Sequence, residues 1–225
     1  MLLCQTGRAE SRAQPDYTEE VEDVVPDQRP TLRSEQVAQT RAALVGAGRD
    51  LFGERGFAAT SVEDLARAAR VTTGALYHHF PNKTALFESV FEELHAELLA
   101  DSAAAAATAD AGIEQLARGS EAFLDAVLRP EVARILVIDA PAVLGLARFT
   151  ELDERYAVAA TVLVLRAATE SGALEVEDPE TLARLWMGVL TRGGMLIASS
   201  PHPGRTRDQV ARAARALLAG LAPGA

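Results

Sequence analysis

The sequence predicts an all-α fold, and three observations support this. Alanine, leucine, arginine and glutamate are abundant, and these side chains lose little conformational freedom in a helix. From residue 34 onward, apolar residues recur at the three-, four- and seven-residue intervals that mark one face of a helix. The sequence shows no apolar–polar alternation bounded by turn signals, which would indicate a strand. We therefore expect helices packed on helices, with a small N-terminal head and a larger C-terminal body.

The charge of the chain is unevenly distributed. The 225 residues carry a net charge of -10, yet residues 34–90 hold six basic and six acidic residues. A whole-chain excess of acid therefore does not exclude nucleic acid as a partner of that segment, because one small face can differ from the average. Cys4 is the only cysteine, so no intrachain disulfide or multi-cysteine metal site is expected. No apolar run reaches the length of a membrane span, and we expect a cytoplasmic protein.

The first 33 residues differ in composition from the rest of the chain. They contain Pro15, Pro26 and Pro30, many charges and no sustained apolar period. Such a segment cannot bury enough apolar surface to fold by itself. We expect residues 1–33 to form a disordered N-terminal tail.

Residues 34–90 are expected to form a head of three helices with the start of a fourth. The first helix covers about 34–54, where Val37, Leu44 and Leu51 are spaced by seven. A second, over about 61–68, follows a capping-box pattern made by Thr60 with Glu63 or by Ser61 with Asp64. A third begins after Thr72 or Thr73 and runs to about His79, because Pro81 ends it. Asn82 is expected to cap a fourth helix from Lys83 to about Thr108.

The body, residues 91–225, is expected to contain five further helices. Pro130 and Pro141 are expected to restart the chain, and Asp178 followed by Pro179 gives a cap with proline in the first turn. Thr206 with Gln209 matches another capping box. The expected helices cover about 111–128, 130–139, 142–171, 179–199 and 206–221.

The segment 61–79 matches a helix-turn-helix, in which the second helix enters the DNA major groove. Leu76 and Phe80 fall on one side of that helix. The polar or small residues Thr73, Gly74, Tyr77 and His78 project from the other side, where they can reach base edges or phosphates. Lys83, in the first turn of the next helix, suits a phosphate. From spacing alone, two capped surface helices without a DNA role remain an equal alternative.

The residues themselves resemble a known family. The stretches GFAATSVEDLA at 56–66 and VTTGALYHHFPNKTALF at 71–87 resemble the TetR family of bacterial regulators, and the resemblance extends over about residues 36–91. It implies a three-helix DNA-binding head, a fourth connecting helix, and an all-helical body that dimerises and senses ligands. By position, the resemblance implies DNA contacts at Ser61, Thr72, Thr73, Gly74, Tyr77, His78 and Lys83.

Two positions depart from the family pattern. Arg70 stands where the family usually has glycine in the turn. A non-glycine residue at positive φ costs roughly 1 kcal/mol or more, so either the turn is reshaped or Arg70 compensates by contacting phosphate. Glu63 and Asp64 lie near the expected DNA-facing end of the second helix, where they would repel phosphate. We therefore expect weak non-specific DNA binding.

The body is expected to enclose a largely apolar ligand pocket between its helices. The candidate lining residues are Phe123, Phe149, Trp186 and Met187, and the candidate orienting groups are His95, Asp139 and Arg148. For each aromatic residue, plain core packing is the alternative. For the charged residues, the alternative is a solvated surface. The resemblance transfers no ligand residues.

The last two helices are expected to form a homodimer interface. Small residues there allow helices to approach closely, either between chains or within one chain: Gly188, Gly193, Gly194, Ala211, Ala214 and Gly220. The sequence contains no nucleophile elbow, phosphate loop, zinc motif or dinucleotide fingerprint, so we expect no enzyme, catalytic residue, metal or cofactor. We predict a repressor that a small-molecule effector releases from a palindromic operator. A ligand-dependent activator, and a helical interaction module without ligand, are the alternatives.

Overall fold

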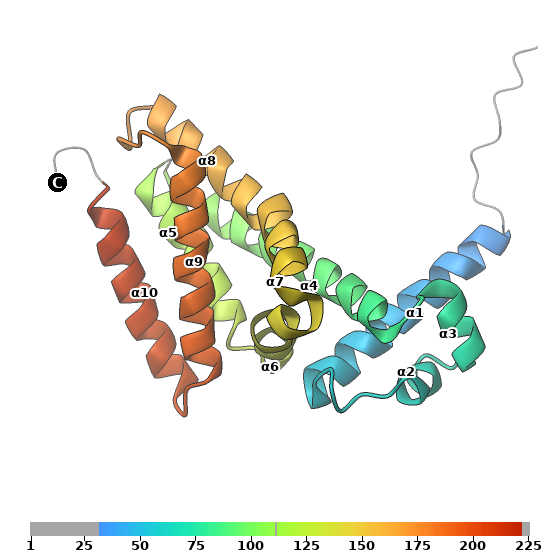
Figure 1. Ribbon diagram of the computed structural model, residues 1–225. Coiled ribbons are helices and arrows are strands. Elements are labelled where there is room, and N and C mark those ends of the chain that lie inside the picture. Colours follow the sequence, from blue (N-terminus) through green and yellow to red (C-terminus); the bar gives the residue numbers. More distant parts are fainter. Residues whose placement is uncertain (1–31, 111, 222–225) are drawn as a thin grey trace, which may run out of the picture.

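The computed structural model describes residues 32–110 and 112–221, which fold into helices joined by short turns (Figure 1). The head contains α1 (Leu32–Arg55), α2 (Val62–Ala68) and α3 (Thr73–His79). The long helix α4 (Lys83–Ala106) starts beside the head and runs into the body. Most of the predicted tail lies outside the described residues, but Leu32 and Arg33 already belong to α1, so the first helix begins two residues earlier than predicted.

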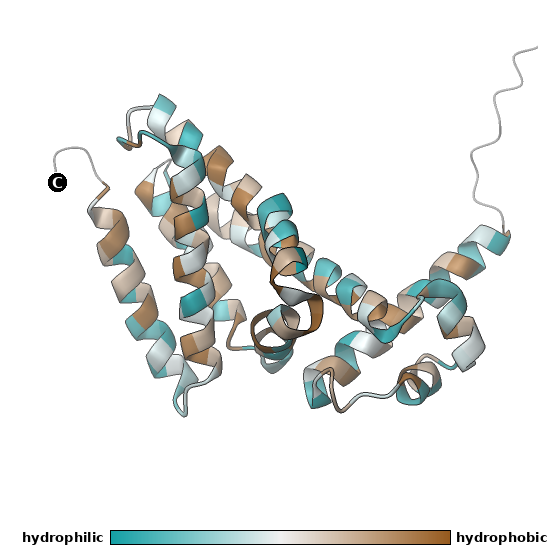
Figure 2. Ribbon diagram, in the orientation of Figure 1, coloured by the Kyte–Doolittle hydropathy of each residue, from teal (hydrophilic) through white to brown (hydrophobic). Residues whose placement is uncertain are grey.

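The elements of the body in order are α5 (Ile113–Ala126), α6 (Pro130–Val132), the π-helix η1 (Ala133–Asp139), α7 (Ala140–Asp153), the π-helix η2 (Glu154–Val158), α8 (Ala159–Glu170), α9 (Pro179–Ala198) and α10 (Pro203–Ala219). The most extensive helix pair there is α4 with α5, and α9 packs against α5, η1, η2, α8 and α10. The last two helices pack side by side at the end of the molecule away from the head (Figure 1). Polar and apolar residues alternate along both, as expected of helices with one buried and one exposed face (Figure 2).

Side-chain caps fix the helix starts of the head. Of the two capping boxes that the sequence allowed, the structure forms the one in which Ser61 caps α2 with Asp64. Thr72, rather than Thr73, caps α3, and the Asn82 side chain accepts a hydrogen bond from the Ala85 amide at the start of α4, as predicted. Thr60 instead turns inward, and its hydroxyl donates to the Gly56 carbonyl at 2.8 Å.

Two predicted helix boundaries in the body are wrong. The chain does not break at Pro141, because Asp139 and Ala140 keep helical dihedral angles and η1 continues directly into α7. The break falls at Gly145 instead, with φ 76° and ψ 157°, a conformation open mainly to glycine. Helix α10 begins at Pro203 rather than 206, because the Thr206 hydroxyl pairs with the Ser200 hydroxyl at 2.7 Å instead of capping a helix.

Head and body share one hydrophobic core. Phe52 of α1, Phe57 of the following loop and Phe87 of α4 form an aromatic trio with ring centroids 5.3–5.7 Å apart. Phe52 and Phe87 are fully buried, and the same contiguous cluster continues through α4 into the body. The start of α4 is therefore held against the head by packing. Among the described helices, none is long and apolar enough to cross a membrane.

Candidate nucleic-acid interface and ligand cavity

The turn between α2 and α3 keeps a left-handed residue although it lacks glycine. Arg70 has φ 58° and an exposed side chain, and the next amide, that of Val71, donates to the Ala66 carbonyl at 2.9 Å. The turn is therefore not reshaped by the substitution. Arg70 carries backbone strain of roughly 1–2 kcal/mol and presents its guanidinium to solvent at the junction of the two short helices.

Helix α3 has one buried and one open face. Leu76 is fully buried and Phe80, just after the helix, is nearly so. The side chains of Thr73, Tyr77 and His78 are exposed, as is Gly74, and Tyr77 keeps 53% of its surface accessible. A side chain added at Gly74 would meet only the Thr72 hydroxyl within 4 Å, at 3.8 Å, so this face admits close approach of another molecule.

Asp64, one of the two acidic residues expected to repel phosphate, is hydrogen-bonded and ion-paired within the head. Asp64 accepts from the Ser61 hydroxyl at 2.7 Å and pairs with Arg67 at 2.8 Å. The hydrogen bond from Ser61, reinforced by Arg67, lowers the pKa of Asp64, so its charge persists but is matched by a neighbouring cation. Ser61 is exposed, but its hydroxyl is already used in the cap at both its donor and acceptor sides.

The Lys83 side chain links the start of α4 to the loop before α2 by hydrogen bonds. Its ammonium donates to the carbonyls of Phe57 and Thr60, each at 2.8 Å, and lies 4.1 Å from the centroid of the Phe57 ring. Two of its three N–H donors are therefore used inside the protein. One remains for an outside acceptor, so the predicted phosphate contact stays a prediction, and the structure adds a role that sequence reasoning missed.

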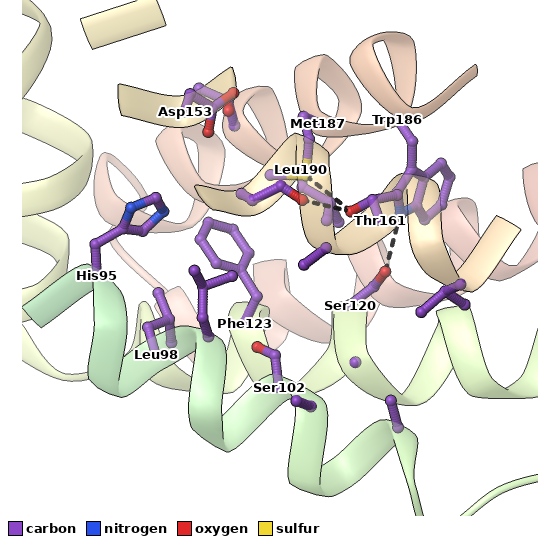
Figure 3. A pocket seen from close by; sticks show the side chains of 18 of the residues that line it. His95, Leu98, Ser102, Ser120, Phe123, Asp153, Thr161, Trp186, Met187 and Leu190 are labelled. Atoms are coloured by element: carbon purple, nitrogen blue, oxygen red, sulfur yellow. Dashed lines mark hydrogen bonds between the residues drawn. The ribbon is translucent and has the colours of Figure 1, made fainter. Parts of the chain in front are cut away.

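A cavity of about 370 Å³ lies in the body (Figure 3). It is lined by residues of α4, α5, η1, α7, η2, α8 and α9. The four aromatic and sulfur-bearing residues named from the sequence all line it: Phe123, Phe149, Trp186 and Met187. Phe91, Leu98, Leu136 and Leu190 extend the apolar wall. Sequence reasoning found these candidates by residue type, and the fold brings them together from well-separated segments.

Most hydroxyl and indole groups in the wall already have partners. The indole nitrogen of Trp186 donates to the Ser120 hydroxyl at 3.0 Å, and that hydroxyl donates to the Leu116 carbonyl at 2.7 Å. The Thr161 hydroxyl donates to the Ala157 carbonyl at 2.9 Å. These groups fix the shape of the wall, and they offer a ligand little beyond apolar contact.

Two titratable groups in the wall are less well satisfied. His95 is 8% exposed, and its Nδ1 atom has no hydrogen-bond partner among the described residues. Burial lowers the pKa of His95 to about 4, so the ring is neutral at pH 7. Burial, with a smaller contribution from Glu154, raises the pKa of Asp153 to about 6. Asp153 was not predicted; its position four residues after Phe149, on the same helix face, was the available signal.

The other two predicted orienting groups lie outside the cavity, so that prediction is wrong for them. Asp139 accepts a hydrogen bond from the Phe57 amide at 2.7 Å and lies 3.6 Å from Arg134. Arg148 donates to Glu88 of α4, with a nitrogen–oxygen distance of 3.0 Å. The Asp139 side chain thereby joins η1 to the head, and the Arg148 side chain joins α7 to the first turns of α4. Their charges are used in the protein's own contacts, which a linear sequence does not reveal.

Most of the small residues in the last two helices pack within the chain. A side chain at Gly193 would come within 2.7 Å of Val210 in α10, and one at Gly194 would meet Val137 and Phe123 at 3.5–3.6 Å. Ala211 and Ala214 are buried. Gly188 is different, because it is exposed and a side chain there would meet nothing within 4 Å.

The site therefore combines an open helix-turn-helix face with a separate apolar cavity. Within residues 32–110 and 112–221, no group of three or more histidine, cysteine, aspartate or glutamate side chains could hold a metal ion. The fold and these two sites define a helix-turn-helix protein with an all-helical body.

Comparison with known proteins places this architecture in a family. Residues 44–90 match the model of the bacterial regulatory proteins of the tetR family, and residues 113–221 match the tetracyclin repressor-like C-terminal domain. A crystal structure of a TetR-family transcriptional regulator from Pectobacterium atrosepticum has 34% identity and a TM-score of 0.75, covering 84% of this chain and 96% of that one. The chain belongs to the TetR family.

Similarity to two characterised regulators is uneven along the chain. The HTH-type transcriptional regulator TtgR of Pseudomonas putida is 41% identical over 61 residues, which cover 27% of this chain and 29% of TtgR. The HTH-type transcriptional regulator CymR, also from Pseudomonas putida, is 29% identical over 172 residues, covering 72% of this chain and 71% of CymR. The match to TtgR thus spans less than a third of that protein.

Proposed function

We propose that this protein is a transcriptional repressor that binds a palindromic operator as a homodimer and releases it when a small molecule occupies the cavity of the body. The observation that carries the proposal is the open polar face of α3, on a helix-turn-helix whose other face is buried. The proposed activity consists of binding alone, so we expect no enzymatic turnover. Operator DNA as the target would place the protein in the cytoplasm.

The proposed DNA contacts come from α3 and the helix ends beside it. Tyr77, His78 and Thr73 are exposed on one face and can reach base edges in a major groove. The open surface at Gly74 allows the helix to approach the DNA backbone closely. Thr72, Ser61 and Lys83 would lie at the rim, where phosphates pass. Arg67 and Arg70 are exposed on the same head and supply positive charge.

The proposed dimer uses the outward faces of α9 and α10. Leu185 and Leu196 of α9 are 65% and 45% exposed, with the open Gly188 between them, and Leu217 of α10 is 58% exposed. Exposed leucines on adjoining helices are typical of a surface that a second chain covers. A two-fold dimer would present its two α3 helices to half-sites about 34–36 Å apart, or a multiple of that spacing.

The proposed release works through elements that contact both the cavity and the head. Leu136 and Val137 of η1 line the cavity, and Asp139 at the end of the same element holds the Phe57 amide. Helix α4 carries Phe91 and His95 into the cavity wall and begins at Lys83. A ligand that favours one position of these elements would lower operator affinity by its differential affinity for the two states.

The test is footprinting of the full-length protein on the DNA that flanks its own gene. We expect protection of a palindrome, and a matched variant, Tyr77→Ala, should lose that protection at the same concentration while keeping its melting temperature. The proposed function would be refuted if the protein protected only asymmetric DNA, or if it protected no DNA even at low salt.

A further inference from the structure

We propose that the cavity of the body takes a lipophilic amine: a protonated amino group bound to Asp153, at the end of the cavity where His95 lies, with an apolar body lying along the rest of the wall. The inference deepens the proposed function, because it names the chemical class of the effector, and it rests on the ligand-sensing part of that proposal.

His95 and Asp153 lie at the same end of the cavity in Figure 3. Contacts between the helices that carry them agree with the picture. Phe91 of α4 contacts Phe149 of α7, with ring centroids 6.1 Å apart, and one turn further along, His95 contacts Tyr156 at 5.8 Å. Asp153 falls between Phe149 and Tyr156 in the sequence and faces the cavity, so it reaches the wall at the level of His95.

The wall carries negative charge without a balancing cation. Among the described residues that line the cavity, Asp153 is the only aspartate or glutamate, and none is a lysine or arginine. The cations nearest in sequence are used elsewhere: Arg148 pairs with Glu88 and Glu151, and Arg155 lies over the Tyr156 ring. Glu154, the neighbouring carboxylate, pairs with Arg184. A carboxylate ligand would meet repulsion at this end, whereas a cation would supply the partner that Asp153 lacks.

The neutral His95 adds no positive charge at the same end. Its Nδ1 atom is buried, has no partner among the described residues and is not part of the proposed amine contact. An ammonium group has three donors and a positive charge, so it can bond to the oxygens of the Asp153 carboxylate and neutralise that carboxylate. The rings of Phe91 and Phe149 stand beside this end, and aromatic faces attract cations. A hydroxyl has a single donor and no charge, so it leaves the Asp153 carboxylate without a counter-charge.

The remainder of the wall suits an apolar body. Beyond Phe123, the cavity is bounded by Trp186, Met187 and Leu190, and the Trp186 indole is already bonded to the Ser120 hydroxyl (Figure 3). An unbranched chain ending in a phenyl ring would cover this apolar surface. The ligand that fits is therefore charged at one end and apolar over the rest.

The test compares three probes that share a phenyl ring and four methylenes and differ only in the head group: 4-phenylbutylamine, 4-phenylbutanol and 5-phenylpentanoate. Titration calorimetry of the full-length protein at pH 7 should show the amine binding at least tenfold more tightly than the alcohol, with the acid weakest. Asp153→Asn should weaken amine binding about tenfold or more and change alcohol binding less than threefold. Asp101→Asn is the matched control, because Asp101 is exposed on α4 and does not line the cavity.

The outcomes separate the inference from the function on which it rests. Equal binding of amine and alcohol, tighter binding of the acid, no binding of the amine, or an unchanged amine affinity in Asp153→Asn would each overturn the inference. Operator binding is measured on the same preparation. Operator binding without a preference for the amine would refute only the proposed ligand class. Absence of operator binding in the unmodified protein would refute the proposed function, and the amine titration would then test only whether the cavity binds an amine.

Discussion

The head and the body build their sites in opposite ways. The groups proposed to contact DNA lie between Ser61 and Lys83. Every helix involved starts with a local cap, in which a backbone amide donates to the side chain of Ser61, Thr72 or Asn82. The cavity draws its wall from residues between Phe91 and Thr191 on seven elements. A helix-turn-helix surface for DNA can be specified by one short segment of sequence, whereas an enclosed pocket forms only when distant segments pack together.

The comparison has a limit, because the two regions are joined by one core. Phe52, Phe57 and Phe87 pack together across the junction, and Asp139 and Lys83 bond to the same short loop at Phe57. The head is thus locally specified but not independent. The predictions below test how far the two regions can be separated, beginning with the largest expected effect.

Phe87→Ala should lower the free energy of unfolding by about 3–5 kcal/mol, because Phe87 is fully buried at the junction and its loss leaves a cavity. Thermal unfolding followed by circular dichroism should show a single transition at a lower temperature. Two separated transitions, with the head melting first, would break the picture of a shared core.

Lys83→Ala should lower the free energy of unfolding by about 1.5–3 kcal/mol, because it removes the charged donor shared by the Phe57 and Thr60 carbonyls. It should also weaken binding to all DNA sequences alike and reduce the salt slope of binding by about 1, if the remaining donor contacts a phosphate. Arg67→Ala, an exposed cation paired only with Asp64, is the control for stability. A lower stability with an unchanged salt slope would make Lys83 purely a structural tie.

Tyr77→Ala should weaken operator binding by about 10–100-fold, in line with the ~1–3 kcal/mol of a specific base contact. The melting temperature should not change, because the side chain is mostly exposed. Tyr77→Phe separates the hydroxyl from the ring in the same gel-shift assay. An unaffected operator affinity in both variants would remove Tyr77 from the interface.

Asp153→Asn should raise the free energy of unfolding by about 1–2 kcal/mol at pH 7. The folded pKa of Asp153, about 6, is above its ordinary value of 3.8, so the unfolded chain releases this proton first and stability is lost as the pH rises from 3.8 to 6. Asparagine has no such loss. Denaturation curves should therefore show a difference at pH 7 that disappears near pH 4, and a constant difference would contradict the assignment.

Deleting residues 1–30 should have the smallest effect. The segment lacks the apolar content to join a core, so the melting temperature, dimerisation and operator affinity should each remain close to those of the full chain. A drop of several degrees in melting temperature would show that this segment docks on the folded part.

The sequence predicted the head more completely than the body for a physical reason. Caps at Ser61, Thr72 and Asn82 are contacts over three residues, so a reader of the sequence can see both partners at once. The sequence could not show that the helix breaks at Gly145 and not at Pro141, because both proline and glycine are signals for a helix break. In the structure the backbone stays helical at Pro141 and leaves the helical region at Gly145, inside α7.

The cavity was predictable by residue type but not by charge. Phe123, Phe149, Trp186 and Met187 were identifiable as large apolar residues on helices, and the fold brings them to one wall. Asp139 and Arg148 were just as visible, yet their partners, the Phe57 amide and Glu88, lie 82 and 60 residues away. Whether a charged side chain faces a ligand or a distant part of its own chain depends on packing that periodicity does not contain.

The left-handed Arg70 has a consequence for anyone who would engineer this protein. Replacing it with glycine should relieve roughly 1 kcal/mol of backbone strain, and a screen for heat resistance would select that change. The same change removes an exposed positive charge from the corner of the helix-turn-helix. A change at this one position should therefore raise thermal stability and lower electrostatic affinity for an anionic polymer. Selection for heat resistance alone would weaken that affinity.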